Sequence, residues 1–329
     1  MHPAGRAAPW AALAFVVLLY LAPVVFAGSP YVLYILTLTL CYAVPAIGLN
    51  LLFGYVGLVS LGHMAFAGVG AYATALLMKA GVGVVPALAA GTLGAGLIGL
   101  LVGIPCLRLR SHFFIIVTLA VGMMLYLLFN NLDWLTGGAA GLPGVPRPQP
   151  LDLGVATIDF RLSEGFYWLA ATAFAVAFAA QYLLVRSDFG RSLAAIRQDE
   201  ALAAARGVDV FAHKLAAFAI SAAIAGLGGG VMALFLRAVA PLSFDFMESI
   251  NLVLIVIVGG AGYLYGPYLG ALLFVALPEF LRAADQLRLV AFGAILLVLA
   301  LYAPRGLCGL AALIGRRLRH TPAGAAADA

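Results

Sequence analysis

Few residues in this sequence could carry bond-breaking chemistry. The five histidines lack a carboxylate at the spacing typical of an acyltransferase, and neither an HExxH nor a CxxC pattern occurs. The three cysteines, Cys41, Cys106 and Cys308, lie in or beside apolar runs, where they are expected to pack as small core side chains. A phosphate-binding GxxxxGKS or GxxxxGKT loop does not occur either. The residues therefore argue against an enzyme and predict no metal ion, no cofactor and no ATP hydrolysis by this chain alone.

Polar side chains that could contact a transported molecule stand inside an apolar, glycine-rich run. Residues 50–70 read NLLFGYVGLVSLGHMAFAGVG, and a histidine within a membrane segment is a functional candidate by default. Two interpretations of His63 stay open, a contact with a ligand and a hydrogen-bonded structural role. Gly68 and Gly70 are expected to let helices pack closely. The candidates for a translocation path in this half of the chain are Asn50, Gly57, Ser60, Gly62 and His63.

A second glycine-rich break interrupts the apolar stretch Asn251–Leu277. Its middle reads GGAGYLYGP over residues 259–267, which cannot form a comfortable continuous helix because glycine and proline both weaken one. We therefore expect two short helices that meet at the break. Glycine-broken segments in corresponding halves of a chain are typical of a transport pathway, where irregular backbone is buried in protein or lines a cavity. The candidates here are Gly259, Gly260, Gly262, Gly266 and Pro267.

One long segment, residues 186–214, is both charged and helix-prone, and apolar runs flank it on both sides. The pattern predicts an amphipathic helix over Ser192–Arg206, with Ser192 as its N-cap and Gly207 as its stop. A structured loop of this kind favours docking of a cytosolic partner, and contact with lipid headgroups fits the composition equally well. The apolar side is expected to hold Leu193, Ile196 and Leu202, with Arg197, Asp199 and Glu200 elsewhere on the helix.

The composition places the chain in a bilayer. It is 65% hydrophobic and 9% charged over 329 residues, whereas soluble domains carry about 25% charged residues. We expect an all-α polytopic membrane protein with about 8–10 transmembrane helices, some of them glycine-broken or re-entrant. The carboxylates are expected in loops, which argues against a proton-coupled pump. The predicted spans are Trp10–Ala27 (retained rather than a cleaved signal), Tyr31–Phe53, Ser60–Met78, Val85–Pro105, Phe113–Asn130, Phe166–Val185, Ala212–Leu236, the broken stretch and Leu287–Tyr302.

The distribution of lysine and arginine predicts the orientation. With the N-terminus in the cytoplasm, about two thirds of the 18 basic residues fall in inner segments. If the broken stretch enters from the outer side and returns, the C-terminus is cytoplasmic as well. We expect one transmembrane domain, 1–320, with 186–214 as a cytoplasmic loop, 131–165 as an outer loop and 321–329 as a disordered tail. The outer loop could serve an extracytoplasmic partner or only connect two spans.

Four blocks of this sequence resemble the permease subunits of branched-chain amino-acid ABC importers, and the LivM-type subunit most closely. They are GLNLLFGYVGLVSLGHMAFAGVGAYATALL (48–77), RLRSHFFIIVTLAVG (108–122), FGRSLAAIRQDEALAAARGVDVFAHKLAAFAISAAIAGLGG (189–229) and VGGAGYLYGPYLGALL (258–273). The resemblance implies a type II ABC importer permease in the bacterial inner membrane that imports leucine, isoleucine or valine. It implies as partners a LivH-type second permease subunit, two cytoplasmic ATP-binding subunits, a periplasmic substrate-binding protein and membrane lipid, and no nucleic acid.

The resemblance also implies roles for the segments singled out above. Residues 186–214 would contain the coupling loop that contacts the ATPase, and both glycine breaks would lie near the translocation path. Departures at Ser111, His112, Met123 and Tyr263 leave the substrate open, since urea and short-chain amide permeases share the same blocks. An ion-coupled secondary transporter and a membrane enzyme of lipid metabolism are rivals of other classes. The ATPase-coupling candidates are Arg191, Ile196, Arg197, Asp199, Glu200 and Gly207.

Overall fold

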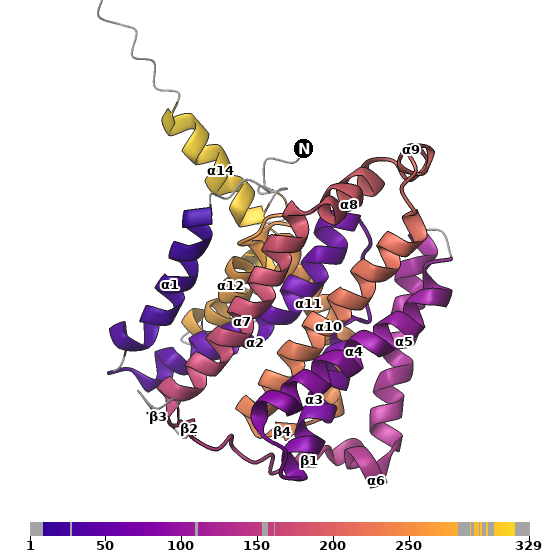
Figure 1. Ribbon diagram of the computed structural model, residues 1–329. Helices are drawn as coiled ribbons and strands as arrows, with labels where there is room; N and C mark the ends of the chain where they lie inside the picture. The colour runs from indigo at the N-terminus through magenta and orange to yellow at the C-terminus, as the bar shows by residue number, and fades with distance from the viewer. Residues whose placement is uncertain are drawn as a thin grey trace, which may run out of the picture.

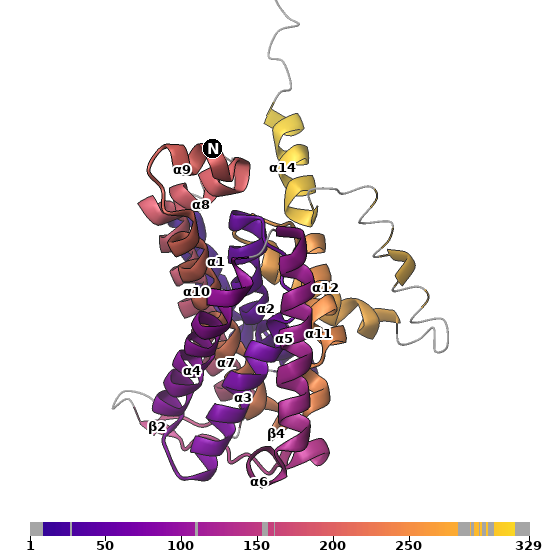
Figure 2. The same cartoon turned by 90° about the vertical axis from the view of Figure 1, so that its right-hand side faces the viewer.

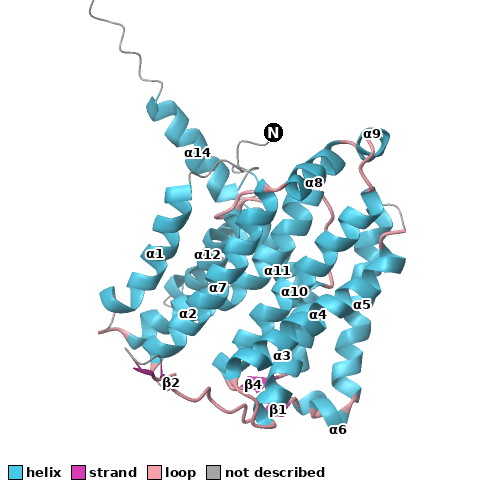
Figure 3. Cartoon of the chain, viewed as in Figure 1, coloured by secondary structure: helices cyan, strands magenta, loops and turns pink. Residues whose placement is uncertain are grey.

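The computed structural model describes residues 9–26, 28–108, 111–152, 157–160, 162–281 and 306–319, with isolated positions between 290 and 301. Within these residues helices form nearly the whole structure, and the strands are two-residue segments at one end (Figure 3). The predicted all-α class is therefore confirmed. Most of the predicted span Leu287–Tyr302 and the predicted tail 321–329 lie outside the described residues.

The unbroken apolar runs form helices close to their predicted bounds. A helix satisfies its own backbone hydrogen bonds, which is what a run of apolar residues must do in hydrocarbon. Five of the described helices have the length and composition to cross a membrane. The helices of these runs are α1 Pro9–Val25, α2 Pro30–Asn50, α3 His63–Lys79, α4 Val84–Cys106, α5 Ser111–Asn131, α7 Ser163–Arg186 and α10 Val210–Leu236. A π-helix, η2 Leu51–Val56, extends α2.

The second broken stretch forms two helices, as predicted. α11 Phe246–Gly259 and α12 Gly266–Phe280 are separated by residues 260–265. The two helices fold back on each other closely, since a Cβ on Gly270 would lie 2.0 Å from the Ile255 carbonyl oxygen. The start of α11 and the end of α12 therefore lie on the same side of the bundle, which is the re-entrant arrangement expected for this stretch.

Segments predicted to share one side of the membrane gather at one end of the bundle. Figures 1 and 2 show α8 Asp188–Gln198, α9 Glu200–Ala205 and α14 Gly306–Arg319 at the upper end. The lower end holds α6 Asp133–Thr136, η3 Gly138–Ala140, η4 Pro241–Phe244, the antiparallel pair β1 Leu142–Pro143 with β4 Ala238–Val239, and the pair β2 Leu151–Asp152 with β3 Thr157–Ile158. The assignment of the upper end to the cytoplasm stays a prediction.

Small residues bring the central helix α10 against its neighbours. A Cβ on Gly70 of α3 would lie 2.1 Å from the Gly226 carbonyl oxygen of α10, so the two backbones touch. A Cβ on Gly68 would lie 2.7 Å from the Phe129 ring of α5. Helices in a membrane associate through such close packing, because lipid is as apolar as the side chains. The predicted packing role of Gly68 and Gly70 is confirmed.

Candidate functional site at the two glycine breaks

The first break follows the π-helix. Gly57 has a φ of 87°, and residues 57–62 are not helical. Side chains of other helices take up the free backbone amides on either side of the turn. The Leu61 amide donates to Thr118 Oγ1 of α5 at 3.3 Å, and the Met64 amide donates to Ser249 Oγ of α11 at 3.1 Å. The first break is therefore held by α5 and α11, as buried irregular backbone must be.

Asn50 joins the two breaks directly. Its side chain is fully buried, accepts a hydrogen bond from the Gly262 amide at 2.8 Å and donates one to the Tyr263 carbonyl at 3.0 Å. The backbones also touch, since a Cβ on Gly54 would lie 2.3 Å from the Gly262 nitrogen. Two segments more than 200 residues apart thus form one unit. Sequence reasoning placed Asn50 on the pathway, and the structure gives it a precise pair of partners.

The second break is as compact as the first. A Cβ on Gly259 would lie 1.9 Å from the Gly266 carbonyl oxygen, so the end of α11 and the start of α12 are in backbone contact. Gly260 has a φ of 114°, which side-chain-bearing residues rarely adopt, and it also contacts Gly306 at the start of α14. Pro267 is buried in the first turn of α12, where its missing amide hydrogen costs nothing.

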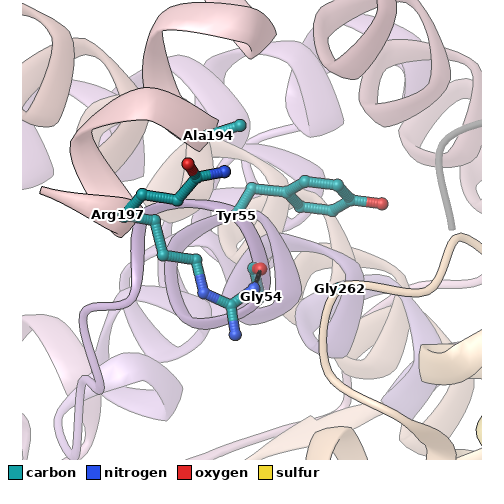
Figure 4. A pocket seen from close by; sticks show the side chains of 6 residues that line it. Gly54, Tyr55, Ala194, Arg197 and Gly262 are labelled. Atoms are coloured by element: carbon teal, nitrogen blue, oxygen red, sulfur yellow. Dashed lines mark hydrogen bonds between the residues drawn. The ribbon is translucent and has the colours of Figure 1, made fainter. Parts of the chain in front are cut away.

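Arg197 connects this unit to the charged end of the molecule. Its guanidinium donates a hydrogen bond to the Gly54 carbonyl, and its aliphatic part covers Gly57, where a Cβ would lie 3.2 Å from Arg197 Cγ. The side chain reaches from α8 into a pocket of about 250 Å³, and Figure 4 shows it extending toward Gly54. The pocket is lined by Gly54, Tyr55, Ala194, Arg197, Gln198 and Gly262. One arginine therefore touches both glycine breaks from the charged loop.

The helix predicted over Ser192–Arg206 has different bounds. Ser187, not Ser192, is the N-cap, and its hydroxyl accepts from the Gly190 amide at 3.4 Å. Asp199 adopts an extended conformation that ends α8, and its carboxylate caps the start of α9. The two-helix arrangement arises because Asp199 can serve as a new N-cap in the middle of the pattern. The predicted stop at Gly207 is confirmed by its φ of 84°.

The remaining coupling candidates point in different directions. Ile196 is 2% exposed and packs against the membrane body together with Leu193. The Arg191 side chain is 56% exposed and pairs with Asp188. Glu200 pairs with Lys214 at the start of α10, and Gly207 lies open to its surroundings. The exposed surface of this region is thus formed by residues of both α8 and α9.

Ser60 and His63 are both fully buried next to the first break. His63 Nε2 lies 3.3 Å from Ser221 Oγ, whose own hydroxyl donates to the Gly48 carbonyl at 2.6 Å. Because the Ser221 hydroxyl proton is donated to Gly48, His63 Nε2 carries the proton and donates to Ser221 Oγ. In the neutral ring Nδ1 is then an acceptor. Among the described residues neither His63 Nδ1 nor Ser60 Oγ has a hydrogen-bond partner. His63 therefore combines a structural bond with a free acceptor.

The prediction that carboxylates lie in loops is wrong for Glu248. This residue stands in the first turn of α11, which begins five residues before the predicted start at Asn251, and the carboxylate faces Tyr42 and Asn251. Asp245 provides the N-cap that starts the helix early. Sequence reasoning also missed Thr118, Ser221 and Ser249. Thr118 and Ser221 are lone hydroxyl residues within apolar runs, and that pattern could have marked them, whereas Ser249 stands beside Glu248 and carries no such signal.

Comparison with known proteins agrees with this geometry. Residues 31–301 match the family model described as branched-chain amino acid transport system / permease component. The chain belongs to this family. It is 32% identical over 292 residues to the high-affinity branched-chain amino acid transport system permease protein LivM of Escherichia coli. The aligned residues cover 83% of this chain and 69% of the relative. It is 27% identical over 293 residues to the corresponding protein LivH of Salmonella typhimurium, covering 83% of this chain and 92% of the relative.

Both breaks and the charged loop lie within the matched residues, so the family model includes the whole candidate site. The LivM protein of Salmonella typhimurium is similar at 31% identity over 292 residues. No solved structure matches the chain. The permease is a multi-pass membrane protein, and the predicted class and family are confirmed.

Proposed function

We propose that this permease is the LivM-type membrane subunit of an ABC importer that carries leucine, isoleucine or valine inward across the inner membrane. Support comes from the relatives, which are named as branched-chain amino acid transport permeases. The permease would pair with a LivH-type subunit, receive substrate from a periplasmic binding protein and bind two cytoplasmic ATPase subunits. Its own role is translocation rather than catalysis.

The contact between Arg197 and Gly54 carries the mechanistic part of the proposal. Closure of the ATPase subunits on ATP would move α8 and α9. Leu193 and Ile196 of α8 are buried against the membrane helices, so α8 would move together with the helices that it packs against. Arg197 would pass this motion to Gly54, and Asn50 would pass it on to the second break. Two discrete arrangements of the joined breaks would then give alternating access.

The groups near the first break suit a zwitterionic substrate with an apolar side chain. The start of α3 lies inside the bundle, and helix N-termini stabilise anionic groups. Ser60 and His63 stand beside this start and have free polar atoms. The surrounding spans are apolar, which suits an aliphatic side chain. We infer that Asn50, Gly57, Ser60, Gly62, His63 and the break at 259–267 border the path.

The orientation belongs to the same proposal. The loop 186–214 must face the cytoplasm for an ATPase to reach α8, and 131–165 then faces the periplasm together with β1 and β4. Both termini would be cytoplasmic. Single cysteines placed at the exposed positions Leu202 and Trp134, in a background without the three native cysteines, test this. Impermeant labelling from outside should modify the Trp134 position only, and labelling of the Leu202 position would overturn the orientation.

Reconstitution tests the function itself. The permease with its second permease, ATPase subunits and binding protein should accumulate radiolabelled leucine in proteoliposomes only when ATP reaches the ATPase side. Unlabelled isoleucine and valine should compete, and urea and acetamide should not. Uptake by this chain alone under an ion gradient would assign it instead to the secondary transporters. Competition by urea or acetamide, but not by isoleucine, would assign it to the amide permeases.

A further inference from the structure

Glu248 is a half-buried acidic residue in the first turn of α11. Its Oε2 atom is enclosed and has no hydrogen-bond partner among the described residues. The neighbouring polar groups are the Tyr42 hydroxyl of α2 and the Asn251 amide of α11. Tyr42 lies at the middle of the 27-residue span Pro30–Val56. The carboxylate therefore lies beside the middle of a helix that is long enough to cross a membrane.

No described cation balances this charge. The ion pairs of the charged loop, Arg191 with Asp188 and Lys214 with Glu200, do not involve Glu248. The carboxylate of Asp245 repels Glu248 and already accepts the Glu248 amide at 2.9 Å as the N-cap of α11. An ionised carboxylate taken out of water is strongly disfavoured unless a cation pairs with it. Glu248 Oε2, which has no hydrogen-bond partner among the described residues, is therefore suited to bind a cation.

The position of Glu248 relates it to the first break. Ser249, the next residue of α11, accepts a hydrogen bond from the Met64 amide in the first turn of α3 at 3.1 Å. The free atoms of Ser60 and His63 flank that same turn. Glu248 itself is half-buried, and the adjacent Met247 is 55% exposed, so the residue borders the surface of the chain. An ammonium group at Glu248 could thus belong to a molecule whose carboxylate faces the start of α3.

We propose that Glu248 binds the α-ammonium group of the amino acid during translocation, with Tyr42 and Asn251 orienting its carboxylate. The inference rests on the proposed function and deepens it by naming the residue that recognises a zwitterion. It also explains why an acidic residue stands in an apolar bundle whose proposed cargo has an uncharged side chain. Urea and acetamide carry no ammonium group and would gain nothing from this carboxylate.

The test compares Glu248→Gln, Glu248→Asp and the control Glu164→Gln in the complete reconstituted complex. Glu164 lies in the first turn of α7 as Glu248 does in α11, so the control removes a negative charge from an equivalent position of another helix. Leucine uptake and ATP hydrolysis are measured in parallel, with the amount of assembled complex. We expect Glu248→Gln to lower the leucine transported per ATP by about 10- to 100-fold, the size of one hydrogen bond to a charged group. Glu248→Asp should recover part of this loss, and Glu164→Gln should transport as wild type does.

Each other outcome has a defined meaning. Leucine transport by Glu248→Gln within two-fold of wild type would show that the carboxylate is a neutral structural group and would overturn the inference. Failure of Glu248→Gln to assemble with the second permease would assign Glu248 to that interface and would also overturn it. If the wild-type complex itself transports no leucine, the proposed function is wrong, and this result is distinct from a loss that appears only in the Glu248 variants.

Discussion

Replacement of Arg197 by alanine should uncouple ATP hydrolysis from transport. The guanidinium donates to the Gly54 carbonyl, and Gly54 is in backbone contact with Gly262 of the second break. Arg197→Ala removes a side chain of α8 that touches both breaks. The ATPase subunits could still close on ATP, but their motion would no longer reach residues 57–62 and 259–266. Uptake should therefore fall while ATP hydrolysis continues.

The size of the effect follows from the contact. A hydrogen bond to a charged group contributes about 1.5–3 kcal/mol, and partial exposure of Arg197 brings this to about 1–2 kcal/mol. Since about 1.4 kcal/mol corresponds to a factor of ten, leucine transported per ATP should fall by about 5- to 30-fold. The leucine transported per ATP by Arg197→Lys should lie between the wild-type and Arg197→Ala values, because a single ammonium group replaces the planar guanidinium.

The assay measures leucine uptake and phosphate release in the same proteoliposomes. Arg108→Ala is the matched control, because Arg108 is exposed after α4 at the same end of the bundle. We expect this control to keep the wild-type ratio. If Arg197→Ala transports leucine with the wild-type ratio, the breaks receive their motion by another route and the reasoning is refuted. Equal loss in both variants would show that only positive charge at this end matters.

Four further substitutions, with one control, probe the joined breaks and the exposed surface of α8 and α9. Asn50→Ala removes two buried hydrogen bonds and should lower the melting temperature of the purified permease by several degrees; an unchanged melting curve would contradict this. Gly54→Ala should reduce the yield of folded permease, since the added Cβ would lie 2.3 Å from backbone, whereas Gly94→Ala meets nothing within 4 Å and should be neutral. Arg191→Ala and Glu200→Ala should each lower coupled uptake without affecting membrane insertion, and unchanged uptake would remove them from the docking surface.

Much of the fold can be predicted from the sequence because the signals are local. Apolar runs of sufficient length specify helices in a bilayer, and each predicted span within the described residues is found near its expected bounds. The break at 259–267 follows from its glycines and its proline, and the stop at Gly207 follows from the same chemistry. The family blocks are local as well. The class, the breaks and the charged loop are thus properties of the sequence itself.

Only the tertiary structure decides which side chains meet. Arg197 is 143 residues from Gly54, and nothing in a helical pattern says whether an arginine on α8 points outward to a partner or inward to a carbonyl. Asn50 finds its partners in the second break, 212 and 213 residues away, because packing of α2 against α11 and α12 brings them together. Glu248 belongs to a helix rather than a loop because Asp245 caps α11 early. Local patterns determine elements, whereas contacts between distant elements depend on how their surfaces pack.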